Sequence, residues 1–270
     1  MKVAFQGEPG AYSEEAIFQH FGATAEPLPR PYLRDVFDAV EGGEAEVGLI
    51  PVENTIEGSI VRSFDLLNER SLKARGEVIL RVIHCLIANP GVSLPDVVKV
   101  YSHPQALGQC RSFIEEHGLE SVAAPDTAGS VKMLKTSGIR DAAAIASSRA
   151  AEVYEMTIIE RGIETHKENY TRFIAIGGED RQPTSDDKTS LVFATDHRPG
   201  TLHIALGSFA RKQIDLTKIE SRPQVGKPWE YLFFVDIVGH RDDPDMREAL
   251  DELRENTRMV KVLGSYPRSA

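Results

Sequence analysis

The sequence predicts an α/β protein built in two parts, and two patterns separated by a linker support this. From the start to about residue 160, apolar runs lead through turns of small polar residues into segments of helical periodicity, which is βα repetition. After a polar stretch between Gly178 and Lys188 that contains Pro183, the order becomes strand, helix, strand, strand, helix, strand, as in a ferredoxin-like unit. A length of 270 residues suits two such parts, since one domain takes roughly 100–200 residues.

In the first part, each expected strand leads through a turn into a helix. The expected pairs are Val3–Gln6 with a helix from Ser13, Val47–Val52 with Ser59–Leu67, Val97–Tyr101 with Pro104–His117, and Ala142–Ala146 with Ser148–Tyr154. Ser13 is expected to cap its helix, and Ser102 with Gln105 fits a capping box. Because every turn follows a strand's carboxyl end, the turns are placed where open α/β sheets bind ligands.

The second part is expected to begin after the linker. Its predicted elements are a strand Ser190–Ala194, a helix from about Gly200 to Lys212, strands Leu216–Ser221 and Tyr231–Val238, a helix from about Pro244 to Glu255 and a strand around Val260–Gly264.

Composition excludes some functions. A net charge of -10 disfavours a binder of nucleic-acid backbones, which needs Lys and Arg against phosphates. A small anionic ligand stays compatible, because it responds to local N–H groups and one or two arginines. Cys85 and Cys110 lie in apolar surroundings without metal-ligand spacing, which favours packed thiols in the cytoplasm. No apolar run reaches the length of a membrane span, and no targeting segment is expected.

Several motifs stand in the order and spacing of one enzyme family. In the first part they are Gly10-Ala11-Tyr12-Ser13, the segment Pro51–Ser59, Ser102-His103-Pro104-Gln105, Ala144-Ile145-Ala146-Ser147 and Thr171-Arg172-Phe173; in the second part they are Pro199-Gly200-Thr201-Leu202, Glu220-Ser221-Arg222-Pro223 and Phe233-Phe234-Val235-Asp236. Over nearly its whole length the chain resembles a monofunctional prephenate dehydratase with a C-terminal ACT regulatory domain.

The resemblance implies a two-lobed catalytic domain similar to type II periplasmic binding proteins. It covers about residues 1–180, with lobe one at about 1–77 and 165–180 and lobe two at about 78–164. A regulatory ACT domain then covers 187–270. A chain ended near Pro183 is expected to keep its chemistry and to lose its regulation.

The reaction implied by the resemblance is a decarboxylating dehydration. Prephenate loses carbon dioxide and hydroxide to give phenylpyruvate, and no cofactor is expected because aromatisation drives the step. Thr171 can donate a hydrogen bond to the departing oxygen, which leaves poorly without help. Arg172 offers a planar fork to a carboxylate or forms an ion pair at the hinge. Phe173 excludes water from the ring or is a core residue. Glu53 is a proton source if desolvation raises its pKa, or it only caps a turn.

Uncharged hydrogen-bonding residues are expected to hold the substrate carboxylates without adding repulsion. The candidates are Asn54, Thr55, Ser59 and Gln105, with Ser13, Ser102 and Ser147 at helix starts that aim N–H groups at anions. His103 is a second candidate acid, but its place before Pro104 favours a structural role.

The resemblance also implies regulation. The two regulatory motifs, with Gly200, Thr201, Leu202, Glu220, Ser221, Arg222 and Pro223, are expected to bind phenylalanine between paired ACT domains of a homodimer or homotetramer. Thr201 departs from the alanine usual at that position, which affects the expected affinity for the effector.

Two other functions remain open from sequence. An arogenate dehydratase has the same fold and chemistry, with an amino group in place of the side-chain keto group. A non-catalytic two-lobed protein for an amino acid or aromatic acid would bind its ligand without turnover.

Overall fold

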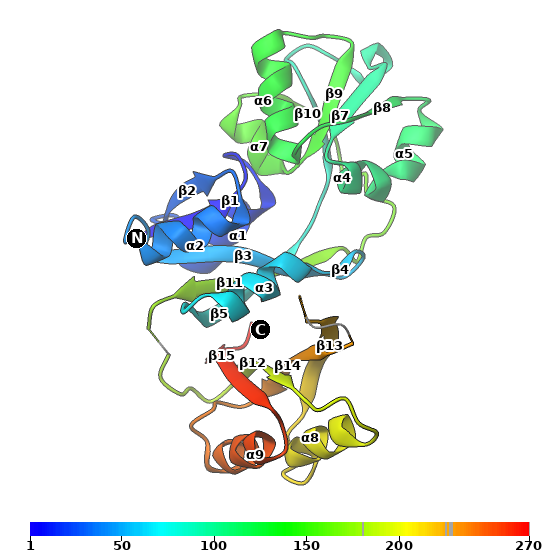
Figure 1. Cartoon of the computed structure of the whole chain (residues 1–270). Coiled ribbons are helices and arrows are strands. Elements are labelled where there is room, and N and C mark those ends of the chain that lie inside the picture. Colours follow the sequence, from blue (N-terminus) through cyan, green and yellow to red (C-terminus); the bar gives the residue numbers. More distant parts are fainter. Residues whose placement is uncertain (180, 225, 227–228, 270) are drawn as a thin grey trace. The chain divides into compact units, whose positions relative to one another are not determined.

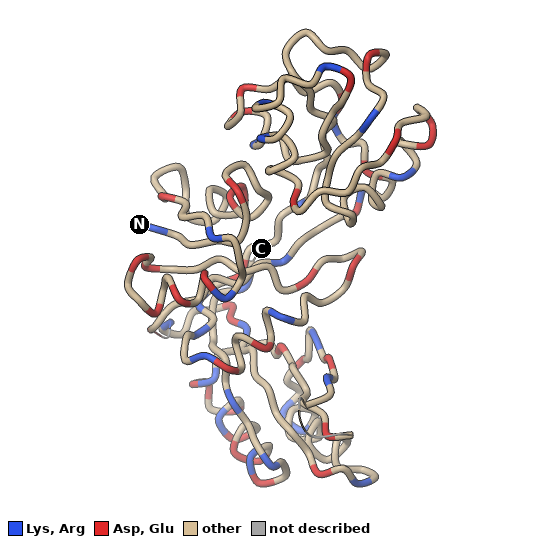
Figure 2. The backbone as a smooth tube through the Cα atoms, turned by 45° about the horizontal axis from the view of Figure 1, so that its top comes forward, with Lys and Arg blue, Asp and Glu red and all other residues tan. Residues whose placement is uncertain are grey.

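The computed structural model describes residues 1–179, 181–224, 226 and 229–269, and Asp180 of the expected linker is outside them. The chain forms two compact units. Unit 1 comprises Met1–Ile60 and Val78–Phe173, and unit 2 comprises Val61–Glu77 and Ile174–Ala270. Figure 2 shows acidic and basic residues interspersed along the backbone of both units. No described helix is both long and apolar enough to cross a membrane.

The first sheet has the strand order β2-β1-β3-β11-β5, with β4 paired to β3. Its strands are β1 (Lys2–Gln6), β2 (Glu26–Arg30), β3 (Val47–Asn54), β4 (Gly58–Ser59), β5 (Lys73–Arg81) and β11 (Tyr170–Gly177), and its helices are α1 (Tyr12–Phe21) and α2 (Leu33–Glu41). Both helices pack against β1 and β3. The central strands are apolar and fully buried, as Phe5 and Leu49 illustrate, because helices and sheet shield them from water.

The second sheet, in unit 1, has the order β10-β6-β9-β7-β8. Its strands are β6 (Cys85–Ala88), β7 (Lys99–Ser102), β8 (Glu120–Ala123), β9 (Ala142–Ala146) and β10 (Thr157–Arg161); its helices are η1 (Leu94–Asp96), α4 (Pro104–Gln109), α5 (Arg111–Glu116), α6 (Thr127–Ser137) and α7 (Ser148–Val153). Alternate residues of β9 enter two different core clusters, with Ala144 in one and Ile145 in the other. The period of two places these clusters on opposite faces. Each lobe thus has its own sheet, and the expected two-lobed α/β architecture is confirmed.

Unit 2 contains the ferredoxin-like fold that the sequence predicted. Its elements are α3 (Val61–Glu69), β12 (Asp187–Ala194), α8 (Thr201–Ala210), β13 (Leu216–Pro223), β14 (Tyr231–Val238), α9 (Pro244–Glu255) and β15 (Met259–Pro267). The antiparallel sheet has the order β13-β14-β12-β15, and α8 and α9 lie side by side against it (Figure 1). The first strand begins at Asp187 rather than Ser190, because Asp187 and Lys188 are buried in the sheet.

Helix α3 packs on the face of this sheet opposite to α8 and α9. Phe233 joins the core beneath α8 and α9, so the next residue, Phe234, points to the other face. There its ring lies 5.3 Å from that of Phe64 on α3. Arg222 Nη2 lies 2.6 Å from Asp65 Oδ2, and Lys261 Nζ donates to the carbonyl of Arg70 at 2.8 Å. The segment that follows β4 in sequence is therefore part of unit 2.

A glycine permits a close backbone approach beside this contact. A Cβ built on Gly264 of β15 would lie 2.2 Å from the carbonyl oxygen of Ala74, and the φ of Gly264 is 157°. Any side chain there would push β15 away from the Val61–Glu77 segment. A buried ion pair reinforces the same region, with Lys188 Nζ 2.9 Å from Glu77 Oε2.

Three helix starts differ from those expected. Helix α1 begins at Tyr12 without a side-chain cap, and Glu14 Oε2 instead accepts from the N–H of Gly10 at 2.7 Å. The cap of α4 is His103, whose ring accepts from the Gln105 N–H, while Ser102 ends β7. The expected helix from Ser59 begins at Val61, because Ser59 pairs with β3. Ser147 lies at a helix start as expected, and it caps α7, since its hydroxyl accepts from the Ala150 N–H at 3.1 Å.

Candidate functional site

A pocket of about 410 Å³ lies in unit 1, where the turns after strands of both sheets meet. Of the residues expected to form the site, five line it: Ser13, Asn54, Gln105, Thr171 and Phe173. Asn54 ends β3, and Thr171 and Phe173 are in the neighbouring strand β11. Asn54 thus lies at the carboxyl end of its strand, where open α/β sheets bind ligands, whereas Thr171 and Phe173 lie near the start of β11.

The side-chain amide of Asn54 fixes the hydrogen-bonding role of Thr171. Asn54 Oδ1 accepts from the N–H groups of Ile56 and Glu57 at 2.9 and 3.0 Å, so the NH₂ group is turned the other way. It donates to Thr171 Oγ1 at 3.0 Å. Since the Thr171 oxygen is the acceptor in this bond, its own hydrogen stays available for a group in the pocket.

Thr55 ties the turn after β3 to the start of β11. Its hydroxyl donates to the carbonyl of Glu168 at 2.9 Å and accepts from the N–H of Tyr170 at 2.9 Å. Thr55 does not line the pocket, nor does Ser59 on β4. Both residues therefore lie where they support the turn that carries Asn54.

Two other expected residues, Ser102 and Ser147, are buried beside the pocket rather than in its lining. The hydroxyl of Ser102 donates to the carbonyl of Ile145 at 2.6 Å, and that of Ser147 donates to the carbonyl of Gly10 at 2.6 Å. These bonds connect the strand ends of the site to one another.

Glu53 and Arg172 contact each other. Arg172 Nη1 lies 3.6 Å from Glu53 Oε2, and only 10 % of the arginine side chain is exposed. Neither residue lines the pocket. The pairing favours the structural alternative for Arg172 and gives Glu53 a cationic neighbour. The described residues that do line the pocket include no Lys or Arg, whereas Glu57 and Asp126 are among them. Among the described residues, a ligand there therefore meets neutral donors and two carboxylates but no Lys or Arg side chain.

Sequence reasoning missed four polar residues of this region: Tyr12, His84, Gln109 and Asn169. Asn54 Nδ2 donates to Asn169 Oδ1 at 2.8 Å, and Asn169 Nδ2 donates to Gln109 Oε1 at 2.9 Å. Gln109 stands four residues after Gln105, hence on the same helix face, and Asn169 opens the motif that contains Thr171. Nothing in the sequence near His84 marks it as a site residue, since it stands in an apolar run between Ile83 and Cys85.

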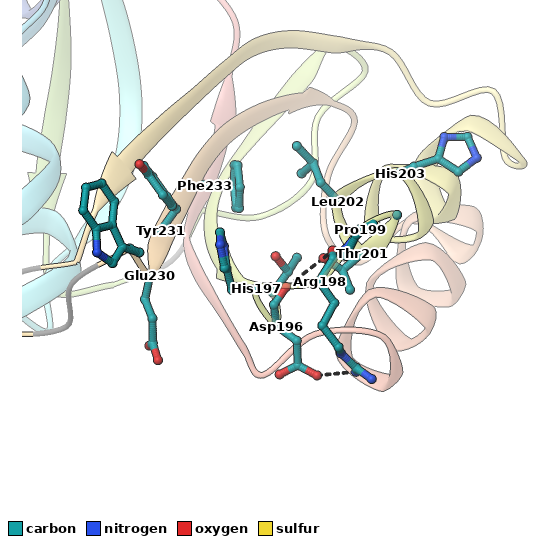
Figure 3. A pocket seen from close by; sticks show the side chains of 13 residues that line it. Asp196, His197, Arg198, Pro199, Thr201, Leu202, His203, Glu230, Tyr231 and Phe233 are labelled. Carbon is teal, nitrogen blue, oxygen red and sulfur yellow. Dashed lines mark hydrogen bonds and ion pairs between the residues drawn. The ribbon is translucent and has the colours of Figure 1, made fainter.

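A second hollow, of about 450 Å³, lies in unit 2. Figure 3 shows Tyr231 and Phe233 of β14 facing Leu202 and the loop before α8. Gly200, whose φ of 86° is left-handed, and Thr201 also line this hollow. The hydroxyl of Thr201 donates to carbonyl oxygens of Asp196 and Arg198, at 2.8 and 2.9 Å. Thr201, which departs from the usual alanine, thus holds the loop before α8 together through its hydroxyl.

The motif Glu220-Ser221-Arg222-Pro223 divides between two faces of the sheet. Ser221 pairs with Phe233, which lines the hollow, so Ser221 shares the face of the hollow. Glu220 and Arg222 point to the face that carries α3. None of the four residues is in the lining itself. Within the described part of the chain, Arg222 Nη1 is buried without a hydrogen-bond partner.

Fold and sites together define a class of protein. A two-lobed α/β unit holds a pocket lined by the Thr171 hydroxyl, and a ferredoxin-like unit of the ACT type carries a second hollow. The chain belongs to the prephenate dehydratase family: the family model "Prephenate dehydratase" matches residues 3–181, and the "ACT domain" model matches residues 189–255. The expected family and the expected dehydratase, a lyase, are confirmed.

Known proteins are similar to the chain over nearly its whole length. The bifunctional chorismate mutase/prephenate dehydratase of Aquifex aeolicus is 41 % identical over 100 % of this chain and 74 % of the relative. Arogenate dehydratase/prephenate dehydratase 2 of Arabidopsis thaliana is 41 % identical over 99 % and 73 %.

Two solved structures are also similar. The prephenate dehydratase of Arthrobacter aurescens in complex with L-Phe has a TM-score of 0.91 and 30 % identity, covering 99 % of this chain and 90 % of that one. GqqA, described as a novel type of quorum quenching acylase, has a TM-score of 0.93 and 35 % identity, covering 100 % and 98 %.

Proposed function

We propose that Thr171 assists the departure of hydroxide as this dehydratase converts prephenate to phenylpyruvate, carbon dioxide and water. The bond from Asn54 Nδ2 to Thr171 Oγ1, 3.0 Å long, carries the proposal. It makes the threonine oxygen an acceptor and directs its hydrogen toward the substrate.

The electron flow needs no electron sink outside the substrate. As the ring carboxylate leaves as carbon dioxide, the electron pair of its C–C bond moves into the ring, and the opposite C–O bond breaks with its pair on oxygen. The hydroxide formed takes up a proton to become water. The enzyme's task is to stabilise the charge that develops on the departing oxygen, where one positioned donor contributes about 10²-fold or more.

The pocket holds the two substrate carboxylates with uncharged groups in this proposal. Ser13 and Gln105 line the pocket, and Ser13 is in the first turn of α1, whose N–H groups favour an anion. Phe173 forms an apolar wall beside the ring. Thr55, Ser59, Ser102 and Ser147 support these groups from behind, and the Glu53–Arg172 pair holds the base of β11.

The direct experiment mixes the full chain with prephenate and follows phenylpyruvate by ultraviolet absorbance. Turnover supports the proposal, whereas tight binding without product would identify a non-catalytic binding protein. Parallel reactions with arogenate test the second candidate, because the name of the plant relative includes both arogenate and prephenate dehydratase. A larger kcat/KM on arogenate would assign that substrate instead.

We also propose that phenylalanine restrains the enzyme through unit 2. A relative of known structure is described in complex with L-Phe, and Ser221 shares the face of the hollow beside Gly200. An effector shifts activity only by binding one conformation better, and a coupling of about 1–3 kcal/mol is typical. Edge strand β13 exposes Ile219, which suits the pairing of two ACT domains in a homodimer or homotetramer.

The ACT domain is proposed to begin at the segment between β11 and β12, as the sequence predicted, although Val61–Glu77 and Ile174 onward also belong to unit 2. The cytoplasm is the proposed location. Cys85 and Cys110 are buried and free of disulfides, and burial raises the pKa of Cys85 to about 11. Thiols of this kind are inert packing residues of a reducing compartment.

A further inference from the structure

A chain of hydrogen bonds runs through the pocket of unit 1 to Thr171. Beyond Asn169 and Gln109 it continues to His84, whose Nε2 lies 2.7 Å from Gln109 Oε1. It ends at Tyr12, whose Oη lies 2.7 Å from His84 Nδ1. Tyr12, His84 and Gln109 all line the pocket, and none of them belongs to the residues that the motifs indicated as catalytic.

The orientation of the Gln109 amide is fixed independently of His84. Its Nε2 lies 3.4 Å from Glu57 Oε1, a carboxylate that accepts hydrogen bonds and cannot donate when ionised. Its Oε1 lies 2.9 Å from the NH₂ group of Asn169, whose own oxygen faces the Asn54 NH₂ group. Gln109 Oε1 is therefore the atom that faces His84.

The tautomer of His84 follows from this orientation. An amide oxygen only accepts, so His84 Nε2 must carry a hydrogen. Burial lowers the pKa of His84, and it does so against the opposing effects of Gln109 and Glu164. The ring is then neutral near pH 7 with a bare Nδ1. Burial also raises the pKa of Tyr12 well above its usual value, so the phenol keeps its hydrogen. Two acceptors lie near it, His84 Nδ1 at 2.7 Å and the carbonyl of Ile83 at 3.3 Å, and with Nδ1 bare the shorter bond takes the hydrogen.

The titratable groups near this pair act in known directions. Glu164 Oε2 accepts from the backbone N–H of His84 at 3.0 Å, and Lys167 Nζ is 3.7 Å from Glu164 Oε1. Cys85, Cys110 and Glu15 raise the pKa of Tyr12 further. None of these groups supplies a hydrogen to Nδ1 in place of Tyr12.

We propose that His84, held by Tyr12 as the tautomer with hydrogen on Nε2, is a positioning residue that donates to Gln109 Oε1 and so reinforces the direction of the hydrogen-bond chain ending at Thr171. This inference rests on the proposed function. With hydrogen on Nδ1 instead, the lone pair of Nε2 would face the lone pairs of Gln109 Oε1. Turning Gln109 would bring its NH₂ group against that of Asn169. Asn54 cannot turn in response, because two backbone N–H groups hold its oxygen.

The first test reads the tautomer without any substrate. In the full chain labelled with ¹⁵N-histidine, the His84 ring signals are identified by their loss in the variant His84→Asn. At pH 7 we expect a protonated Nε2 and an unprotonated Nδ1. A hydrogen on Nδ1 overturns the proposal about His84 whatever the enzyme's activity. The proposed function is tested separately, by the prephenate assay, so the two proposals can fail independently.

The second test uses Tyr12→Phe, which removes one hydroxyl and keeps the ring. We expect kcat on prephenate to fall about three- to tenfold, as for the loss of the hydrogen bond to His84, with KM unchanged within about twofold. The longer contact with the carbonyl of Ile83, at 3.3 Å, is lost as well. Donation from Tyr12 to Nδ1 at 2.7 Å stabilises the neutral ring, so its removal should raise the pKa of His84. The acid limb of the kcat profile should therefore move to higher pH.

Tyr154→Phe is the matched control. Tyr154 is in unit 1 but outside the pocket lining, and among the described residues its buried Oη has no hydrogen-bond partner. This variant should keep the kcat and the pH profile of the parent. A Tyr12→Phe enzyme that also keeps both would show that the His84 tautomer does not influence Thr171.

Discussion

Each unit contains one arginine that motif reasoning assigns to a ligand, and in each unit that arginine pairs with a carboxylate. Arg172 is 3.6 Å from Glu53 in unit 1, and Arg222 is 2.6 Å from Asp65 in unit 2. Neither arginine lines the hollow of its unit. A motif arginine is thus placed to hold the structure around a site as readily as to contact a ligand.

The two ion pairs differ in whether the arginine keeps a buried N–H donor without a hydrogen-bond partner. Arg222 keeps a buried Nη1 that has no partner among the described residues, and an unsatisfied buried donor is costly. Such a donor suits an arginine whose partner arrives later, or one whose contacts change with conformation. In Arg172 the corresponding nitrogen, Nη1, contacts the carboxylate of Glu53.

The largest expected effect follows from ending the chain near Pro183. Phe64 is 3 % exposed and packs on Phe234, so the truncated chain exposes α3 and loses several kcal/mol of burial. The structure therefore predicts that it aggregates or unfolds at a much lower temperature, whereas the sequence alone predicts retained chemistry. Supplying residues 184–270 as a separate chain is the control and should restore folding. A truncated chain with the parent's melting temperature and turnover would restore the original view.

Thr171→Ala should lower turnover on prephenate at least about a hundredfold, since a positioned donor is lost. Thr171→Ser keeps the hydroxyl and should lose much less. Phenylalanine binding, measured by calorimetry, should stay unchanged in both variants, because their effect is confined to unit 1. Wild-type turnover in Thr171→Ala would show that Thr171 does not assist the departing hydroxide, and the site of unit 1 would then lie elsewhere.

Gly200→Val should abolish or strongly weaken phenylalanine binding while basal turnover stays intact. A β-branched residue is strained at a φ of 86°, and it narrows the hollow. Ser221→Ala should weaken binding by less, about 1 kcal/mol for one hydrogen bond. If calorimetry finds parental affinity in both variants, the effector binds elsewhere.

Arg172→Lys separates the two alternatives for the unit 1 pair. A point ammonium does not reproduce a planar fork, so we expect activity to fall about tenfold if the guanidinium orients β11 beside Thr171. Urea unfolding and turnover per folded molecule are measured together. A large drop in stability with unchanged turnover would make the pair purely structural.

Asp65→Asn should have the smallest effect. Burial raises the pKa of Asp65 more than the nearby Arg222 lowers it. A carboxyl with a raised folded pKa contributes stability that is present at low pH and is lost as pH rises through that pKa. The asparagine variant should therefore be as stable as the parent at pH 7, or more stable by less than about 1 kcal/mol. In urea unfolding at about pH 3, below the usual carboxyl pKa, this difference in the free energy of unfolding should vanish. A variant that is much less stable than the parent at pH 7 would contradict a raised pKa of Asp65.

Periodicity and turn residues predicted most of the architecture. The βαββαβ order followed from apolar runs separated by turn residues, as did the strands predicted at Val47–Val52 and Ala142–Ala146, which the structure shows at Val47–Asn54 and Ala142–Ala146. Helix starts were less accurate, because Glu14 caps the N–H of Gly10 from inside the helix and the His103 ring replaces Ser102. Both arrangements depend on side-chain geometry that local spacing does not encode.

The site was predicted in part, for a related physical reason. Asn54 and Thr171 belong to motifs, and they meet because β3 and β11 are neighbours in one sheet. His84 and Tyr12 are separated by 72 positions and are joined through their ring atoms, so no local pattern connects them. The sequence also did not predict that α3 belongs to unit 2, since the apolar residues of α3 fit a partner in either unit equally well.

The membership of Val61–Glu77 in unit 2 bears on how such enzymes can be recombined. A regulatory module exchanged at the linker alone would meet a foreign α3, with Phe64, Asp65 and the backbone around Ala74 unmatched to the new sheet. Gly264 makes the mismatch sharp, because only a glycine leaves room for Ala74 at that contact. Hybrids that also carry residues 61–77 from the donor should fold more often. The segment to be exchanged with the ACT domain is therefore discontinuous in the sequence of this chain.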